Sequence, residues 1–314
     1  ATKLLAGKPV EVTLVDRRNH HTFQPLLYQV ALAALSPGEI AQPIRTMFRD
    51  MQNIDVLMDE VIAIDSAAKS VHLRSNATLN YDYLILGTGA THSYFGHEDW
   101  ASLAPGLKTI EDALEIRRRV LLAFELAERQ KLEHGSHPPL NFVVVGGGPT
   151  GVELAGAISD ISRLYMRQEF RHIDPAKARV ILLEGSPRVL AAYPEDLSQK
   201  AQQQLEELGV EVRTGFHVTD IQPGYVVGNG EKIESVVTLW AAGVAASPVG
   251  KMLDMEMDKR GAIIVDEYLN PAGHPEIFVC GDLAHVIENG RLIPGVAQPA
   301  MQMGDHAARE ILAD

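Results

Sequence analysis

The chain alternates short apolar runs with amphipathic stretches, a pattern typical of strands that alternate with helices. Residues 141–145 (NFVVV) and 179–183 (RVILL) are apolar and rich in β-branched side chains, as buried parallel strands are. Helical patterns follow them at residues 150–169 and 194–208, and a third strand is predicted at residues 210–214. Strand, helix and strand in this order form βαβ crossovers, so we predict a parallel sheet here.

The segments on either side of this region carry strand signals of their own. Residues 10–15 (VEVTLV) and 81–86 (YDYLIL) precede it, and residues 277–279 (IFV) follow it. Residues 109–133 form a long amphipathic helix pattern between the first flank and the parallel sheet. Because strands return after a complete βαβ region, we interpret one domain as inserted into another.

The predicted fold class is therefore α/β, with two Rossmann-like dinucleotide-binding domains. We place the inserted domain at residues 109–258 and the outer domain at residues 1–108 and 259–314. Residues 1–6 (ATKLLA) resemble the last turns of a helix. The chain is therefore expected to begin inside an element, and we expect the glycine-rich turn of the outer domain to lie before Ala1.

Composition and charge exclude several classes of protein. A chain of 314 residues with 46% hydrophobic content is long enough for two domains. Its formal net charge of −13 argues against nucleic-acid binding, because a phosphate backbone is held by a local excess of Lys and Arg. No apolar run approaches the roughly 20 residues that span a bilayer, and the first residues lack a signal-peptide pattern.

Thiol and metal chemistry are also disfavoured. Cys280 is the single cysteine, so the chain has no internal disulfide, no redox pair and no cysteine metal cluster. We interpret Cys280 as a small buried core residue. The twelve histidines show no metal-ligand spacing, and we expect His20 and His21 to be a solvated loop pair. No metal site is predicted.

The strongest motif is the segment FVVVGGGPTGVELAG at residues 142–156. Its glycines follow a strand directly and open a helix, and this context makes the pattern specific. Gly146 permits a tight turn, Gly148 lets the backbone approach a pyrophosphate, and Gly151 allows close packing of the helix. The helix N-terminus adds partial positive charge. The motif predicts a dinucleotide site in an otherwise acidic protein.

Glu184 stands at the end of the next strand, where a carboxylate accepts hydrogen bonds from the adenosine ribose hydroxyls. The same charge repels a 2′-phosphate, so we predict a preference for NADH over NADPH. The gap between glycines and acid exceeds the usual roughly 20 residues, but its position at a strand end supports the assignment. Arg188 either softens the preference or is an ordinary surface side chain.

Asp16 stands at the end of its strand, as Glu184 does, and this similarity predicts a second dinucleotide site. Taken alone, an acid at this position is a helix cap or a loop residue as often as it is a ribose ligand. The segments LILGTGA and TLWAAGV, which contain Thr88, Gly89 and Gly243, each end a strand in small residues. Small residues let backbone lie against a ligand, although simple tight turns explain both segments equally well.

Residues 277–282 (IFVCGD) resemble the second flavin-binding motif of the pyridine-nucleotide-dependent flavoprotein superfamily. The resemblance implies that Gly281 and Asp282 bind the ribityl or phosphate part of FAD and that Asp16 binds its adenosine ribose. Thr88 and Gly89 would then line the FAD site. The resemblance also assigns a set of residues to the NADH site, namely Gly146, Gly148, Gly151, Glu184 and Gly243.

Two further segments resemble type II NADH dehydrogenases, the single-subunit, non-proton-pumping NADH:quinone oxidoreductases. Residues 23–31 (FQPLLYQVA) are similar to the flavin-facing loop of that family, and residues 296–304 (VAQPAMQMG) to its Ala-Gln-x-Ala-x-Gln helix. The resemblance covers nearly the whole chain. It implies that NADH reduces FAD and that reduced flavin passes two electrons to a membrane quinone.

By this resemblance Gln298 and Gln302 lie at the quinone pocket beside the flavin ring, where Gln298 also contacts FAD. Glu153 lies near the place where both substrates approach the flavin, and a buried Glu153 with a raised pKa would suit proton delivery. Met303 departs from the glutamine common in the family. The alternative for Gln298 and Gln302 is a hydrogen-bonded pair on a helix, and the helix macrodipole alone favours an acid at Glu153.

The resemblance also implies a cytoplasmic enzyme that is peripheral on the inner face of the cell membrane, attached through a segment beyond Asp314. It allows a homodimer. One alternative is an NADH-dependent reductase of a ferredoxin- or rubredoxin-like carrier, although no cationic cluster offers a docking patch for an acidic protein. A second alternative is a non-catalytic NAD(H)-binding fragment.

Overall fold

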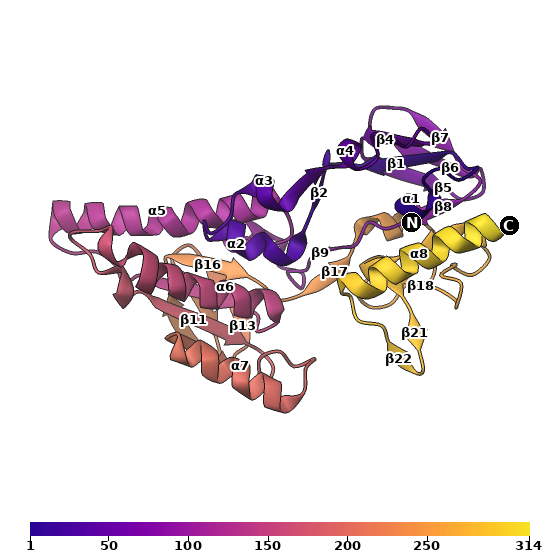
Figure 1. The fold of residues 1–314 in the computed structure, drawn as a ribbon. Coiled ribbons are helices and arrows are strands. Elements are labelled where there is room, and N and C mark those ends of the chain that lie inside the picture. Colours follow the sequence, from indigo (N-terminus) through magenta and orange to yellow (C-terminus); the bar gives the residue numbers. More distant parts are fainter. The chain divides into compact units, whose positions relative to one another are not determined.

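The computed structural model describes all of residues 1–314, which fold into two compact units. The first, called the flanking unit, comprises Ala1–His21, Ala41–Thr91 and Val244–Asp314. The second, called the central unit, comprises Thr22–Ile40 and His92–Gly243. Figure 1 shows the helices and strands of both units.

The central unit is built on a four-stranded parallel sheet with the strand order β12-β11-β10-β16. Its strands are β10 (Asn141–Val145), β11 (Arg179–Glu184), β12 (Val210–Thr214) and β16 (Val237–Trp240). All five residues of β10 are buried, because β10 lies between two strands and its two faces are covered. The βαβ order predicted from the sequence is confirmed.

Different layers cover the two faces of this sheet. On one face lie the helices α5 (Ile110–His134), α6 (Pro149–Asp160) and α7 (Glu195–Glu207), which contact the sheet strands (Figure 1). On the other face lies an antiparallel sheet of β13 (Val218–Gln222), β14 (Tyr225–Gly228) and β15 (Glu231–Glu234). Val143 and Val145 pack toward that sheet, against Ile221, Val226 and Ile233, as the two-residue period of a strand requires.

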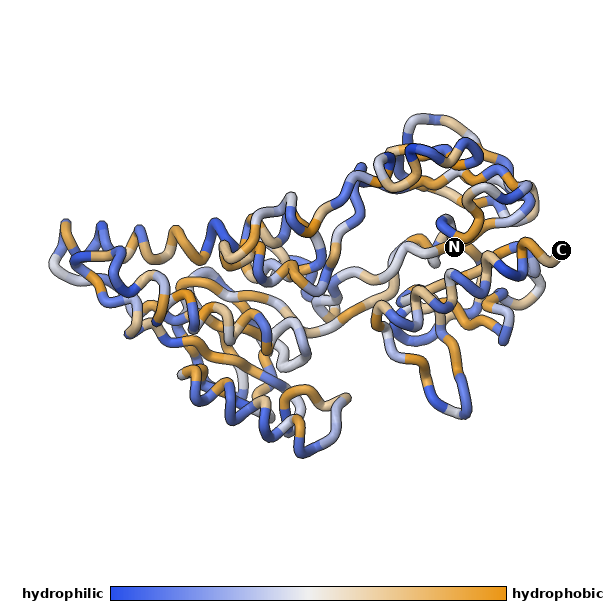
Figure 2. The backbone as a smooth tube through the Cα atoms, in the orientation of Figure 1, coloured by the Kyte–Doolittle hydropathy of each residue, from blue (hydrophilic) through white to orange (hydrophobic).

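Helix α5 has clear start and stop signals. The Thr109 side chain accepts the Asp112 backbone N–H and the Asp112 carboxylate accepts the Thr109 N–H, which forms a capping box. Gly135 ends the helix in the left-handed conformation with φ 74°. In Figure 2 the tube of α5 alternates between hydrophobic and hydrophilic colours, as an amphipathic helix does.

The single helix predicted at residues 150–169 is wrong in its second half. Helix α6 ends at Asp160, and the chain continues as the π-helical turn Ile161–Tyr165 and the 3-10 turn Met166–Gln168. The Ser162 hydroxyl donates a hydrogen bond to the Ile158 carbonyl at 2.6 Å. Such back-bonding by serine bends helices and favours departure from regular α geometry.

The flanking unit is assembled from pairs of parallel strands and a small antiparallel sheet. The parallel pairs are β1 (Val12–Asp16) with β4 (Ile54–Met58), β8 (Leu84–Leu86) with β19 (Ile277–Val279), and β18 (Ile263–Ile264) with β20 (Ala284–His285). The antiparallel sheet contains β5 (Val61–Asp65), β6 (Ser70–Leu73) and β7 (Thr78–Asn80). The strand predicted from residue 81 is thus regular only from Leu84 onward.

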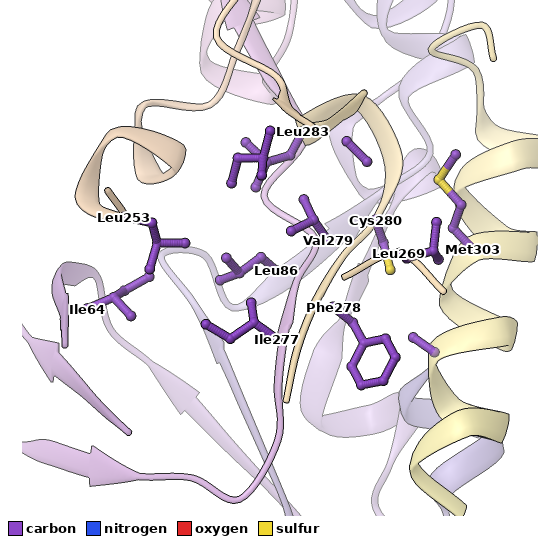
Figure 3. Packing of buried hydrophobic residues seen from close by; sticks show 13 residues of the cluster. Ile64, Leu86, Leu253, Leu269, Ile277, Phe278, Val279, Cys280, Leu283 and Met303 are labelled. Atoms are coloured by element: carbon purple, nitrogen blue, oxygen red, sulfur yellow. The ribbon is translucent and has the colours of Figure 1, made fainter. Parts of the chain in front are cut away.

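The main core of the flanking unit lies around β8 and β19. Figure 3 shows Ile277 and Val279 beside Leu86, whereas Phe278 and Cys280 lie on the side of helix α8 (Ala297–Ala313). These side chains alternate because successive residues of a strand point to opposite faces. The strand therefore joins two layers of the core.

Shorter elements complete both units. They are α1 (Thr2–Leu5), β2 (His20–Thr22), η1 (Gln24–Leu26), α2 (Leu27–Ala31), α3 (Pro37–Ile40), β3 (Ala41–Pro43), α4 (Ile44–Met47), β9 (Ala90–His92), η2 (Glu98–Ser102), η5 (Pro175–Lys177), β17 (Val244–Ala246), η6 (Pro248–Met252), η7 (Gly281–Leu283), β21 (Ile287–Glu288) and β22 (Arg291–Leu292). Helix α2 packs on α5 and α6. No helix is both long enough and apolar enough to cross a membrane.

The compact division differs from the domain limits expected at residues 109 and 258. The stretch before α5 belongs to the central unit because Tyr94 and Trp100 pack on Trp240, with ring centroids 5.2 and 5.7 Å away. The Trp240 indole N–H also donates to the Ser93 carbonyl at 2.9 Å. On the other side, Leu253 is buried in the core of the flanking unit. The assignment of FAD and NADH to separate domains stays a prediction.

Candidate nucleotide-binding sites

The turn between β10 and α6 can be made only with glycine at two positions. Gly146 has φ 109°, and an added Cβ would lie 2.5 Å from the backbone nitrogen of Ala242. At Gly151 an added Cβ would lie 1.8 Å from the Gly146 carbonyl oxygen. No shift of a side chain relieves either contact, since the opposing atoms are backbone. The packing roles predicted for Gly146 and Gly151 agree with this geometry.

Gly148 differs from its neighbours because the space beside it is open. An added Cβ would meet no heavy atom within 4 Å. Gly148 is the N-cap of α6, a 12-residue helix, and no side chain caps this end. The first N–H groups of a helix carry partial positive charge and bind anions. The residues at this helix end therefore fit a pyrophosphate.

Glu184 lies beside the glycine turn. The register pairs Val145 with Leu183, so the end of β10 and the end of β11 lie side by side. The Glu184 carboxylate accepts the backbone N–H of Gly147 at 2.5 Å and that of Ser186 at 2.6 Å. Two backbone donors thus fix a negative charge at the carboxyl edge of the sheet.

Gly243, predicted to contact NADH, makes a tight packing contact. It has φ 80°, and an added Cβ would lie 2.6 Å from the Ser93 carbonyl oxygen and 2.7 Å from the Phe95 ring. The simpler interpretation, a tight turn that requires glycine, accounts for Gly243 by itself. A contact with NADH stays a prediction.

In the flanking unit, Asp16 repeats the local arrangement of the acid in the central unit. It ends β1, and its carboxylate accepts the backbone N–H of Arg18, two residues further on, at 2.8 Å. Glu184 accepts the N–H of Ser186 across the same interval. Each acid therefore turns the chain at the carboxyl end of a parallel strand.

The other FAD residues predicted from the sequence are gathered at one sheet edge. Val279 pairs with Leu86 in parallel register, and the Cys280 N–H donates to the Leu86 carbonyl at 2.9 Å. The chain then continues from β8 through Thr88 and Gly89, and from β19 through Gly281 and Asp282. These four residues follow adjacent strand ends, with Gly89 at φ 66° and Gly281 at φ 69°. Small residues and one acid at this edge fit the polar part of FAD.

Helix α8 presents its two glutamines and Met303 differently. Gln298 and Gln302 are exposed, and no hydrogen bond joins their side chains, so they do not form the helical pair considered as an alternative. Met303 is buried, and its sulfur accepts the Gly281 N–H at 3.2 Å. The residue that departs from the family pattern thus contacts the turn that precedes Asp282.

Glu153 lies in the first turns of α6, as the sequence predicts, but its side chain is exposed rather than buried. Neighbouring protein atoms still remove part of its hydration, and this desolvation raises the pKa of the Glu153 carboxyl. Because the group is exposed, solvent screens much of the effect. Its expected burial was wrong, whereas a raised pKa agrees with the prediction.

Two other sequence interpretations can be compared with the structure. Cys280 is buried, as predicted, and burial raises the pKa of its thiol to about 11. A thiol held neutral in this way is chemically inert. His20 and His21 lie in the short strand β2 rather than in a loop, although His21 is exposed.

Sequence reasoning missed the loop at residues 186–193. The Leu190 N–H donates to the Gly147 carbonyl at 2.8 Å, and Leu190 adopts φ 50°. The Arg188 guanidinium donates to the carbonyls of Ala191 and Tyr193. The sequence alone leaves Arg188 either as a residue that softens the preference for NADH or as an ordinary surface side chain. No periodic signal in the sequence indicates these hydrogen bonds.

Comparison with known proteins identifies the class. The family model described as pyridine nucleotide-disulphide oxidoreductase matches residues 1–304. The chain belongs to this family, and the predicted pair of Rossmann-like domains is confirmed.

Within the family, the chain is most informatively compared with two proteins of Mycobacterium tuberculosis. Both are named type II NADH:quinone oxidoreductases. One is 43% identical, with 100% of this chain and 70% of the relative covered, and the other is 44% identical, with 99% and 68% covered. The chain is thus a member of the type II NADH:quinone oxidoreductase group, and the resemblance noted from residues 23–31 and 296–304 is confirmed.

Solved structures support the same family and fold. A type II NADH dehydrogenase of Plasmodium falciparum in complex with NADH matches with a TM-score of 0.80 and 25% identity, over 90% of this chain and 61% of that chain. The chain therefore spans about three fifths of the length of that solved protein. A ferredoxin reductase of Rhodopseudomonas palustris matches with a TM-score of 0.80 at 21% identity, which shows a common fold only.

Proposed function

We propose that the chain oxidises NADH through bound FAD and passes two electrons to a quinone without pumping protons. The observation that carries the proposal is the glycine turn with Glu184 fixed beside it, in a chain whose mycobacterial relatives are named for this activity. FAD, when bound, supplies the two-electron exchange between nicotinamide and quinone. The protein binds and orients both partners and excludes water.

The central unit is the proposed NADH domain. Gly146 and Gly151 allow the turn, and the open N-terminus of α6 at Gly148 binds the pyrophosphate. Glu184 accepts hydrogen bonds from the adenosine ribose hydroxyls and repels a 2′-phosphate. Gly243 is proposed to let backbone lie against the nucleotide.

The flanking unit is the proposed FAD domain. Asp16 binds the adenosine ribose of FAD, and Asp282 binds its ribityl or phosphate part together with Gly281. Thr88 and Gly89 lie at the same sheet edge as Asp282, which supports a common ligand. Gly89 and Gly281 carry no side chain, which favours close approach of the cofactor to the backbone.

Quinone and proton handling are assigned to exposed polar groups. Gln298 and Gln302 are available on α8 because neither amide is bonded to the other, and we assign them to the quinone pocket. Gln298 is also proposed to contact FAD. Glu153, with its raised pKa, is proposed to hold a proton near the reacting rings. Unchanged quinone turnover in Glu153→Gln would remove that role.

We further propose that the enzyme is cytoplasmic and peripheral on the inner face of the cell membrane, where its quinone is dissolved. Support comes from the acceptor named for the mycobacterial relatives, because such a quinone is a membrane lipid. A homodimer is part of the same proposal. Fractionation of cell membranes and size-exclusion chromatography test the two points separately.

The function is tested by steady-state oxidation of NADH with two acceptors. A short-chain quinone should support turnover, whereas a ferredoxin or rubredoxin should support little. Preference for the protein carrier would favour the reductase alternative. Binding of NADH without turnover on any acceptor, in chain loaded with FAD, would favour a non-catalytic NAD(H)-binding role.

A further inference from the structure

The loop at residues 186–193, between β11 and α7, is closed by one arginine side chain. The Nη1 atom of Arg188 donates to the Tyr193 carbonyl and its Nη2 atom donates to the Ala191 carbonyl, both at 2.8 Å. A planar guanidinium can make two such bonds at once with little freedom left. Arg188 thereby holds the far end of the loop against its beginning.

The closed loop is joined directly to the glycine turn. The Leu190 N–H donates to the Gly147 carbonyl at 2.8 Å, and the Tyr193 N–H donates back to the Leu190 carbonyl at 2.8 Å. Leu190 is held at φ 50°, a conformation that costs free energy for a side chain of this kind. The surrounding hydrogen bonds must offset that cost.

Gly147 is consequently held from both sides. Its N–H is bonded to the Glu184 carboxylate, and its carbonyl is bonded to Leu190. Val189, the neighbour of Leu190, is fully buried and its carbonyl accepts the Ser198 hydroxyl of α7. The loop, the turn and Glu184 therefore form one hydrogen-bonded assembly.

We propose that Arg188 is a positioning residue for the adenosine half of NADH. By closing the loop it keeps Leu190 on Gly147, and Gly147 in turn fixes the Glu184 carboxylate where it receives the ribose. The guanidinium is engaged with two loop carbonyls, so it does not serve as a phosphate ligand. The inference rests on the proposed function, because it assumes that the turn binds NADH.

The test uses Arg188→Ala and ligands that contain one half of NADH. Calorimetry with ADP-ribose should give a Kd about tenfold higher than in the unchanged protein, since two charge-assisted hydrogen bonds that order the loop are lost. With NADH as donor, KM should rise by a similar factor while kcat changes by less than about twofold. Reduced nicotinamide mononucleotide, which lacks the adenosine half, should show unchanged kinetics.

The Arg188→Lys variant distinguishes the paired hydrogen bonds of the guanidinium from its positive charge. A lysine keeps the positive charge but is a compact point donor, so it should restore only part of the ADP-ribose affinity. Lys200→Ala is the matched control, because it removes a positive charge from the exposed surface of the neighbouring helix α7. It should leave the Kd of ADP-ribose unchanged.

Three outcomes would overturn the inference. One is an unchanged Kd for ADP-ribose in Arg188→Ala, and another is an equal loss with reduced nicotinamide mononucleotide. The third is a selective loss of 2′-phospho-ADP-ribose, which would make Arg188 a phosphate ligand. Failure of the proposed function would appear differently, as absent quinone turnover in the unchanged protein, while the ADP-ribose measurement would still report on the loop.

Discussion

The two units end a parallel strand with an acid in the same way, but they fix that acid differently. Asp16 and Glu184 each accept the backbone N–H two residues further on. Glu184 alone also bonds to a glycine of a strand-helix turn, and that glycine is held in turn by the loop at residues 186–193. The same local pattern thus gives the same turn after each strand. Placement of the Glu184 carboxylate also depends on two further segments of backbone, the glycine turn and the loop at residues 186–193.

The largest effect is expected where a glycine meets backbone. Gly151→Ala places a methyl group against the Gly146 carbonyl oxygen, which cannot move without opening the turn. We expect the free energy of unfolding to fall by about 3 kcal/mol or more. Urea denaturation followed by circular dichroism measures this loss.

Gly148→Ala is the matched control for that variant. The space beside Gly148 is open, so the free energy of unfolding should change by less than about 0.5 kcal/mol. NADH affinity should nonetheless fall, because the methyl group projects where the pyrophosphate is proposed to bind. Equal destabilisation of both variants would contradict this account of the turn.

The next effect concerns the acid of the central unit. Glu184→Gln removes a charged acceptor, and hydrogen bonds to charged groups are the stronger ones, so KM for NADH should rise about tenfold or more. Flavin content should stay the same, since Glu184 belongs to the central unit. Kinetics and the visible spectrum of the purified variant measure the two quantities. Loss of flavin together with NADH affinity would contradict the proposal that the central unit binds NADH and the flanking unit binds FAD.

Asp16→Asn makes the reciprocal comparison in the flanking unit. The Asp16 carboxylate accepts one backbone N–H, whereas that of Glu184 accepts two, so we expect a smaller change, about fivefold in FAD affinity. Titration of FAD into the flavin-free protein measures it, and ADP-ribose binding at the central unit serves as the control. A variant that lost ADP-ribose and kept FAD would reverse the two assignments.

The smallest expected effect is a pH dependence at Glu153. Desolvation raises its pKa in the folded state above the ordinary 4.5, so the folded protein favours the neutral carboxyl. The resulting stabilisation is complete below pH 4.5 and is lost as pH rises through the raised pKa. Glu153→Gln should remove this slope, by less than about 0.5 kcal/mol, because the group is exposed. Denaturation curves recorded at several pH values decide whether the slope disappears.

The sequence predicts the elements that depend on local signals. The amphipathic pattern of residues 109–133 predicts α5, and apolar runs rich in β-branched residues predict β10 and β11. The end of α6 at Asp160 is not predicted, because Ser162 bonds to a carbonyl in a way that its helical spacing does not show.

Candidate sites follow the same rule. Gly146, Gly151 and Glu184 are predicted because strand ends and helix starts restrict their positions. The loop that joins Arg188 to Gly147 is not predicted. Its hydrogen bonds are accepted by backbone carbonyls, and because every residue type has a backbone carbonyl, the sequence does not mark these acceptors. The exposure of Glu153 is missed as well, because its environment depends on tertiary packing.

The central claim is that this chain is a flavoprotein reduced by NADH. The most direct test is the visible spectrum of the FAD-loaded protein, recorded without oxygen before and after one equivalent of NADH is added. The account predicts that the flavin absorbance bleaches and returns when a quinone follows. Flavin absorbance that persists while NADH is demonstrably bound would contradict it.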